Sequence, residues 1–193
     1  MTDLNAFTAL AAAQPRRAAF AALDIRETPE LALASLARRR GSTKPAPFAL
    51  HLPEPGRWVA GQGVAAFWVS PDQWMIEAEG RAEENFAADL KQASPDCTVT
   101  EQTDGWTVFE IVSRSGAAPI EALLSKLVNI DVANFGPGSA TRTGLEDISC
   151  FVIRRSKTHV AVLGARSFAG SLWHALETAA QRVRENATSS SNP

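Results

Sequence analysis

The stretch Trp106–Leu127, WTVFEIVSRSGAAPIEALLSKL, contains the strongest strand signal and the strongest helix signal of the chain. In its first half, Phe109 and Ile111 alternate with Val108 and Val112, a pattern typical of a strand that is buried on both faces. In its second half, apolar residues recur at the i, i+3, i+4 and i+7 spacing of one helix face, after Pro119 in the first turn: Ile120, Leu123, Leu124 and Leu127. The stretch therefore predicts a core strand followed directly by an amphipathic helix.

The chain downstream of this stretch predicts strands and one more helix. Gly136-Pro137-Gly138 is typical of a turn. Three apolar segments separated by short polar turns then predict an antiparallel meander: residues 139–145, 148–154 and 159–163. A last helix is expected after Ser167, its N-cap, with one apolar stripe: Phe168, Leu172, Leu176, Ala179 and Val183.

The chain upstream predicts a hairpin between two helices. The hairpin strands are residues 64–69 and 74–78, joined by a turn with Pro71 at the position that suits its fixed φ. A helix over residues 82–92 and a strand over residues 97–101 follow. The first helix is expected over residues 29–40, because Thr28 can cap it and Gly41 can end it.

The three arginines at the end of this expected helix, residues 38–40, have two interpretations. Cations in a last helical turn interact favourably with the helix dipole, and we favour this explanation. The alternative is a site for an anion. After them, residues 42–63 contain four prolines and three glycines and predict a surface loop.

The order of elements is neither a strict strand–helix alternation nor a list of strands alone. It predicts an α+β protein in which helices pack on antiparallel sheets. We expect a flexible N-terminal arm over residues 1–27, a single domain over residues 28–185 and a disordered tail over residues 186–193. The domain could consist of two similar halves, about residues 28–103 and 104–185.

Composition excludes several classes of protein. Of 193 residues, 45% are hydrophobic and 21% are charged, which suits a globular core, and the net charge of −2 argues against a nucleic-acid partner. No apolar run approaches the length of a membrane span, and the N-terminus lacks the features of a secretory signal, so we expect no membrane association and a cytoplasmic location. Cys97 and Cys150 are expected as buried, reduced thiols.

No motif in the sequence predicts catalysis, cofactor binding or a metal site in this chain. None of the three histidines has another histidine or a cysteine at ligand spacing: His51, His159 and His174. Gly61-Gln62-Gly63 does not form a dinucleotide fingerprint, because a strand is expected after it where the fingerprint needs a helix. Asp72 and Asp104 lie in predicted turns, where aspartate is common for backbone reasons.

Tryptophan is the unusual component, with five residues against no tyrosine. Trp68 is expected in the core. Tryptophan, arginine and phenylalanine are also typical of the centres of protein interfaces. We therefore consider six residues as candidates for a subunit interface: Trp58, Trp74, Trp106, Arg166, Phe168 and Trp173.

An ordered set of short motifs resembles the gamma subunit of heterotetrameric sarcosine oxidase over roughly residues 25–183. The most specific parts are the hairpin Trp68-Val69-Ser70-Pro71-Asp72-Gln73-Trp74 and the late pair Arg166-Ser167-Phe168-Ala169 and Leu172-Trp173. The other parts are LALASLARRRG at residues 31–41, LPEPGR at residues 52–57, TDGW at residues 103–106, and FGPG at residues 135–138 with Thr141.

The resemblance implies a fold like the folate-binding domain of the aminomethyltransferase (glycine-cleavage T-protein) superfamily. It also implies a non-catalytic, structural subunit in a complex that oxidatively demethylates sarcosine to glycine. The implied partners are alpha, beta and delta subunits, chiefly alpha. The implied cofactors are FAD, FMN, NAD, zinc and tetrahydrofolate, all held in other subunits.

Three alternatives stay open at this point. The equivalent subunit of N-methylglutamate dehydrogenase would have a similar sequence. The implied fold would also suit a free-standing, folate-dependent aminomethyl-transfer module, although a fold does not determine a function. The third alternative is an independent interaction module.

Overall fold

The computed structural model describes residues 7–20 and 22–189 of the chain, with side chains up to residue 183. It divides the chain into two compact units. Unit 1 comprises the described residues up to Pro29, Trp106–Pro137, and the described residues from Arg142 onward. Unit 2 comprises Glu30–Gly105 and Gly138–Thr141. Each unit has its own sheet and its own core, so each is described by itself.

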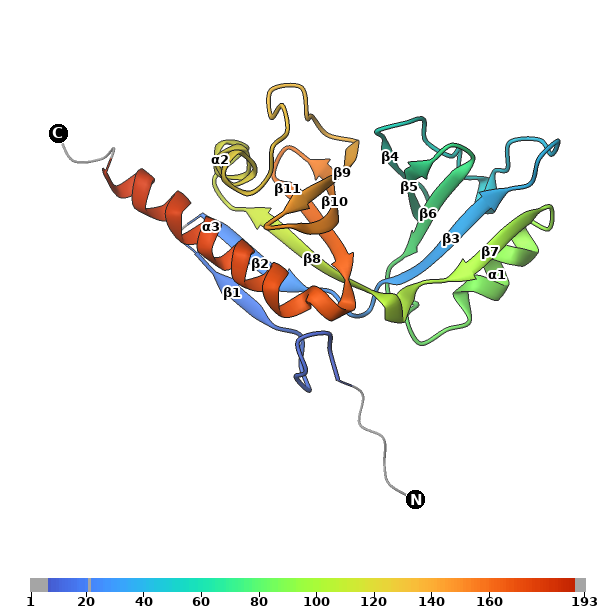
Figure 1. Cartoon of the computed structure of the whole chain (residues 1–193), viewed down its shortest axis with the longest axis horizontal. Helices are drawn as coiled ribbons and strands as arrows, with labels where there is room; N and C mark the ends of the chain where they lie inside the picture. The colour runs from blue at the N-terminus through green and yellow to red at the C-terminus, as the bar shows by residue number, and fades with distance from the viewer. Residues whose placement is uncertain (1–6, 21, 190–193) are drawn as a thin grey trace, which may run out of the picture. The chain divides into compact units, whose positions relative to one another are not determined.

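Unit 1 contains a sheet of six strands in the order β1-β2-β8-β11-β10-β9. Its strands are β1 (Arg17–Ala19), β2 (Leu23–Glu27), β8 (Trp106–Ser113), β9 (Ser139–Leu145, which begins in unit 2), β10 (Ile148–Ser156) and β11 (His159–Ala165). The ladders β1·β2, β2·β8, β8·β11 and β10·β11 are antiparallel. Strand β8, the first part of the stretch Trp106–Leu127, lies in the middle of this sheet (Figure 1).

Two helices cover one face of the unit 1 sheet. These are α2 (Ala118–Leu127) and α3 (Ala169–Ser189), the second of which follows a 3₁₀ turn, η3 (Arg166–Phe168). Their apolar stripes pack on alternate residues of the strands, such as Phe109 of β8 and Val162 of β11, and form one core. At its centre, the rings of Phe109 and Trp173 meet edge to face with centroids 5.5 Å apart.

Unit 2 contains a sheet of five strands in the order β4-β5-β6-β3-β7. Its strands are β3 (Ala32–Arg38), β4 (Trp58–Ala60), β5 (Ala65–Ser70), β6 (Gln73–Ala78) and β7 (Cys97–Glu101). All four ladders between them are antiparallel. Its core lies between one face of the sheet and the helix α1 (Phe86–Ala93). Leu50 and Leu52, from the segment before β4, complete this core. The same segment contains a 3₁₀ turn, η1 (Pro47–Ala49).

Several predicted elements are confirmed with small shifts of their ends. The hairpin strands are β5 and β6, the strand over residues 97–101 is β7, and the three meander strands are β9, β10 and β11 in adjacent positions. The predicted α+β class with antiparallel sheets and packed helices is therefore correct. The helix expected from residue 82 begins at Phe86, because the side chain of Asn85 caps it by accepting a hydrogen bond from the Ala88 N–H.

The helix predicted over residues 29–40 is wrong, because this segment forms β3. The strand lies between β6 and β7, so both of its edges are hydrogen-bonded to distant parts of the chain. Ala32, Ala34 and Leu36 point into the core of unit 2. Alanine and leucine favour helices locally, but this difference of a few tenths of a kcal/mol per residue is overridden by two ladders and a buried face.

The flexible arm predicted over residues 1–27 is also wrong for much of its length. Residues 17–19 and 23–27 form β1 and β2, and Leu23 and Ile25 are buried in the core of unit 1. Residues 1–6 and 21 lie outside the described residues. At the other end, α3 continues through residues 186–189, where we expected a disordered tail, and residues 190–193 lie outside the described residues.

Candidate functional site

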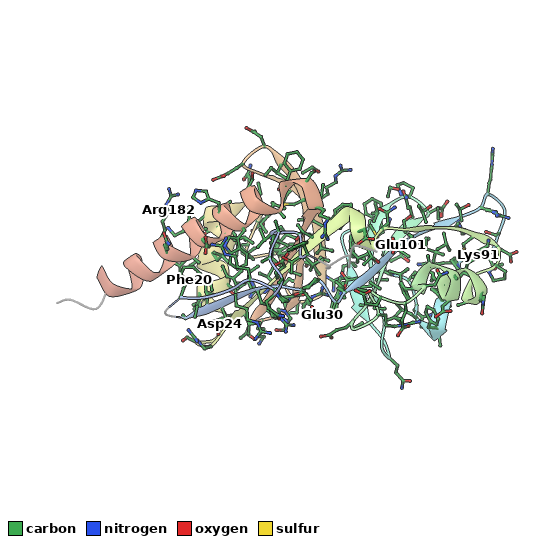
Figure 2. The ribbon with its side chains drawn as sticks, turned by 90° about the horizontal axis from the view of Figure 1, so that it is seen from below. Phe20, Asp24, Glu30, Lys91, Glu101 and Arg182 are labelled. Atoms are coloured by element: carbon green, nitrogen blue, oxygen red, sulfur yellow. The ribbon has the colours of Figure 1, made fainter. Side chains whose placement is uncertain are left out.

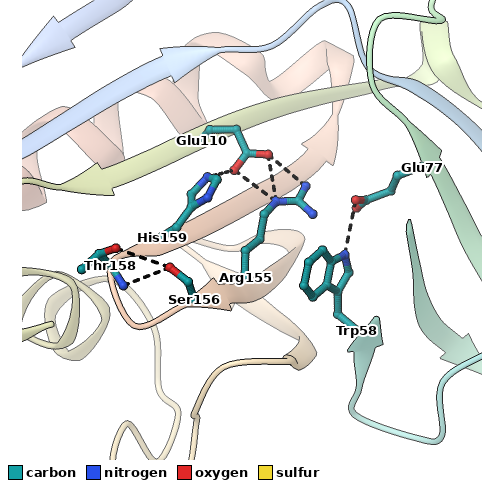
Figure 3. Close-up of polar contacts among 7 residues, drawn as sticks. All are labelled: Trp58, Glu77, Glu110, Arg155, Ser156, Thr158 and His159. Carbon is teal, nitrogen blue, oxygen red and sulfur yellow. Dashed lines mark hydrogen bonds and ion pairs between the residues drawn. The ribbon is translucent and has the colours of Figure 1, made fainter. Parts of the chain in front are cut away.

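The most concentrated group of polar side chains that the structure describes surrounds a buried carboxylate on the central strand of unit 1. Glu110 of β8 is bonded by Arg155 of β10 and His159 of β11 (Figure 3). The Arg155 Nε–H donates to both carboxylate oxygens, at 3.0 Å to Oε1 and 3.2 Å to Oε2. The Nη2 atom of the same guanidinium lies 2.9 Å from Oε1. The His159 Nε2 atom lies 2.6 Å from Oε2. Three neighbouring strands therefore supply one group each.

The environment of Glu110 favours its ionised form. Burial alone would raise the pKa of the carboxyl group, but the hydrogen bond from His159 and the charge of Arg155 outweigh it, so the pKa lies below its ordinary value. Both oxygens of the carboxylate are occupied by these two partners. The cluster connects three strands, and its carboxylate already has a bonding partner at each oxygen.

A second buried carboxylate, Glu27 at the end of β2, holds the N-terminal segment against unit 1. Its Oε1 accepts a hydrogen bond from the backbone N–H of Leu10 and its Oε2 one from that of Arg16, both at 3.2 Å. The Arg16 guanidinium lies over the ring of Trp173, 5.0 Å from the centroid. Residues 10–16 are thus attached to the core at several points, which explains why this part of the chain is ordered.

The interface candidates Trp74 and Trp173 are core residues. Trp74 is 4% exposed, and its indole N–H donates to the Pro53 carbonyl at 2.8 Å. Trp173 is 1% exposed. Neither side chain presents a surface to a partner, so both are removed from the set of interface candidates. Trp68, expected in the core, is half-buried against the core of unit 2.

The remaining tryptophan candidates are half-buried and paired. The indole Nε1 of Trp58 on β4 lies 3.4 Å from Oε2 of Glu77 on β6, within unit 2 (Figure 3). The ring of Trp106 on β8 lies 5.8 Å from that of Phe151 on β10, within unit 1. The part of each ring that stays accessible keeps an interface role open to both residues.

Arg166 and Phe168 lie together on the turn η3 before α3. Phe168 is 49% exposed, and among the residues whose exposure the structure describes it is one of three large exposed apolar residues; the others are Phe7 and Phe48. The guanidinium of Arg166 donates to the backbone carbonyl of Phe7 at 2.8 Å. Phe168 was expected on the core-facing stripe of the last helix and also as an interface candidate, and its exposure suits the second of these roles.

The two cysteines belong to different units. Cys97 is buried in unit 2 and Cys150 in unit 1, and both are free thiols. Within residues 7–20 and 22–189, no group of three or more histidine, cysteine or acidic side chains is arranged to hold a metal ion. In the same residues, no helix is long and apolar enough to cross a membrane.

Comparison with known families decides the relationship of the chain. The model of the sarcosine oxidase gamma subunit family matches residues 42–182. The chain belongs to this family. The family match extends from the segment before β4 of unit 2 to α3 of unit 1, so it includes parts of both units.

Solved structures agree with the fold of this gamma-type subunit. A chain of the heterotetrameric sarcosine oxidase from Corynebacterium sp. U-96, in complex with pyrrole 2-carboxylate, matches with a TM-score of 0.71 and 25% identity, covering 86% of this chain and 88% of that chain. The glycine cleavage system aminomethyltransferase T from Bartonella henselae matches with a TM-score of 0.56 and 12% identity, covering 78% and 44%. The second match confirms the predicted aminomethyltransferase-like fold. No curated protein sequence matches the chain.

Sequence reasoning missed the Glu110 cluster of this gamma-type subunit. His159 was considered only as a possible metal ligand, without a connection to Glu110. The available signal was Glu110 itself, a charged residue inside an apolar strand that was expected to be buried on both faces. A buried charge requires a partner, but the partners come from β10 and β11, more than 40 residues away in the sequence.

Proposed function

We propose that this chain is the gamma subunit of a heterotetrameric sarcosine oxidase, which oxidatively demethylates sarcosine to glycine. The observation that supports it is the match of the gamma family over residues 42–182, together with the likeness to a chain of the Corynebacterium enzyme over most of both chains. The family match includes parts of both units, which supports the role of a complete gamma subunit for this chain. In this proposal the complex works in the cytoplasm.

The proposed role of the chain is structural, and the reaction takes place in the partner subunits. The most concentrated polar cluster supports this role, because the Glu110 carboxylate is already bonded through both of its oxygens. The proposed partners are the alpha, beta and delta subunits, with alpha as the main contact. FAD, FMN, NAD, zinc and tetrahydrofolate are expected in these other subunits.

Co-expression of the chain with the other three subunits tests the proposal. We expect a complex with one copy of each subunit and sarcosine-dependent oxygen consumption. Leaving out this chain should lower the yield of assembled complex while the flavin content per beta subunit stays the same. The decisive measurement is the mass of the purified complex, together with its activity per flavin.

Two results would contradict the proposal. One is failure of the chain to join the other subunits under conditions in which those subunits are folded. The other is tight binding of a flavin or a reduced folate by the isolated chain together with turnover of an N-methyl amine. Assays with sarcosine and N-methylglutamate in parallel would identify the substrate of the complex.

A further inference from the structure

The segment before β1, residues 7–16, runs along unit 1 without joining its sheet or its helices (Figure 1). We call this segment the strap. None of its residues is fully buried. Its apolar contact with the core of unit 1 comes from Ala9 and Leu10, both of which stay partly exposed. Hydrophobic stabilisation scales with the apolar area removed from water, so little of it holds the strap in place.

The first attachment of the strap is centred on Glu27 of β2, which is 3% exposed. The Glu27 carboxylate accepts the backbone N–H groups of Leu10 and Arg16, and the Glu27 backbone N–H donates to the Arg16 carbonyl at 2.9 Å. The Arg16 guanidinium lies over the ring of Trp173, and its Nη2 atom is 3.6 Å from Oε1 of Glu177. One buried carboxylate and one arginine therefore fix the second half of the strap to β2 and α3.

The second attachment lies at the other end of the strap, where the Arg166 guanidinium of η3 donates to the Phe7 carbonyl at 2.8 Å. Between the two attachments the strap has hydrogen bonds of its own. The Thr8 N–H donates to the Ala12 carbonyl and the Ala11 N–H to the Thr8 carbonyl, at 2.9 and 3.0 Å. Ala11 has a left-handed backbone with a φ of 57°, which is unfavourable for a residue with a Cβ atom. The strap is thus a small folded piece that connects its two attachments.

The balance of free energies favours opening of the strap before unfolding of unit 1. Release of the strap gives backbone freedom back to every residue between the attachments, and this entropy opposes the closed state. Against it stand a few hydrogen bonds, each of modest net value, and an ion pair whose arginine side chain is 53% exposed. Strand β8 is different, because both of its edges are bonded to neighbours and Phe109 and Ile111 are fully buried. Regions with few buried contacts open at a lower free energy than such a core strand.

We propose that the strap opens and closes as one piece on unit 1 while the sheet and both helices stay folded. In the closed state, Arg16 covers a face of the Trp173 ring, and the Glu27 carboxylate is engaged by the strap backbone. Opening uncovers this aromatic face and frees the carboxylate, so the strap acts as a lid over these two groups. The lid is a property of the chain itself and does not depend on the complex that the chain joins.

Hydrogen exchange of the complete chain, at several urea concentrations below global unfolding, tests the proposal. The Leu10 and Arg16 amides, which donate to Glu27, should have the same protection within about threefold, because one opening exposes both. Their protection should be about a hundredfold or more below that of the β8 amides. It should also depend little on urea, because the opening exposes little surface, whereas the β8 amides should show the full urea dependence of global unfolding.

Removal of the second attachment tests whether the strap moves as one piece. Arg166→Ala should speed exchange of the Leu10 and Arg16 amides about tenfold, although the bond that it removes lies at the opposite end of the strap. Arg182→Ala, the same change at an exposed position on α3 (Figure 2), is the matched control and should leave both amides as in wild type. Unchanged protection of the β8 amides shows that each variant is folded.

Three outcomes would overturn the strap as an independent lid. One is protection of the two amides equal to that of β8, with the same urea dependence, because the strap would then open only when unit 1 unfolds. Another is absence of protection at both amides in the wild type, because the strap would then not close in solution. The third is an effect of Arg166→Ala that reaches only one amide or neither, or that Arg182→Ala matches.

Discussion

Gly164 on β11 faces Leu172 on α3 so closely that a Cβ atom at position 164 would overlap the Leu172 Cδ1 atom. Leu172 is fully buried, so its side chain has little room to move. Gly164→Ala should therefore lower the free energy of unfolding by about 2 kcal/mol, as overpacking of a core does. Denaturant unfolding measures this change.

Gly170→Ala is the matched control for this contact. Nothing lies within 4 Å of a Cβ atom at this position near the start of α3. The change should leave stability unchanged or raise it by about 0.5 kcal/mol, because alanine restricts the unfolded chain. Equal effects of the two substitutions would contradict the role of the Gly164–Leu172 contact.

Glu110→Gln should destabilise unit 1 by about 3 kcal/mol, because it leaves the half-buried charge of Arg155 without a counter-charge. The measurement is urea unfolding at neutral pH. Asp147→Asn, an exposed change in the β9–β10 turn, is the control and should have little effect. A loss below about 1 kcal/mol would show that the cluster does not join the three strands energetically.

The same carboxylate predicts a dependence of stability on pH. Its folded pKa lies below the value of about 4.3 for an unfolded glutamate, so the unfolded state binds the proton more readily. The contribution of Glu110 is complete above pH of about 4.3 and is lost as the pH falls through the folded pKa. Wild type should therefore lose more stability than Glu110→Gln over this acidic range. Parallel curves for the two proteins would contradict this assignment.

Glu27→Ala should release the N-terminal segment from unit 1. The change removes the acceptors for the backbone N–H groups of Leu10 and Arg16, at a cost of about 1–3 kcal/mol. Hydrogen exchange should speed up at residues 10–16 in particular. Glu30→Ala, at an exposed position, should leave these amides protected.

The two cysteines should resist alkylation in the folded protein. Burial raises the pKa of the Cys150 thiol to about 11 and also raises that of Cys97, so little of the reactive thiolate is present at pH 8. Iodoacetamide should modify neither thiol until the protein unfolds. Because Cys97 belongs to unit 2 and Cys150 to unit 1, pulsed alkylation with mass spectrometry also reports whether the units unfold together. Rapid modification of the folded protein would contradict the burial of these thiols.

Local patterns predicted the elements whose neighbours in the sheet are near them in the sequence. The hairpin of β5 and β6 and the meander from β9 to β11 have turn residues between short apolar runs. The first turn of α1 was misplaced only because Asn85 was not recognised as its cap. Strand β2 also had a local signal, the alternation of Leu23, Ile25 and Glu27, which was obscured by the alanine-rich residues around it.

By itself, the sequence determined the α+β class, the hairpin, the meander, the central strand and helix of residues 106–127, and the membership of the gamma family. These features depend on periodicity, turn residues and ordered motifs, all of which are written locally in the chain. Only the tertiary structure decided that residues 32–38 form a strand, that Glu110 joins Arg155 and His159, and that Trp74 and Trp173 are buried while Phe48 is exposed. The reason is that ladders, ion pairs and burial involve residues far apart in the sequence, and their combined free energy exceeds the local preferences of the residues concerned.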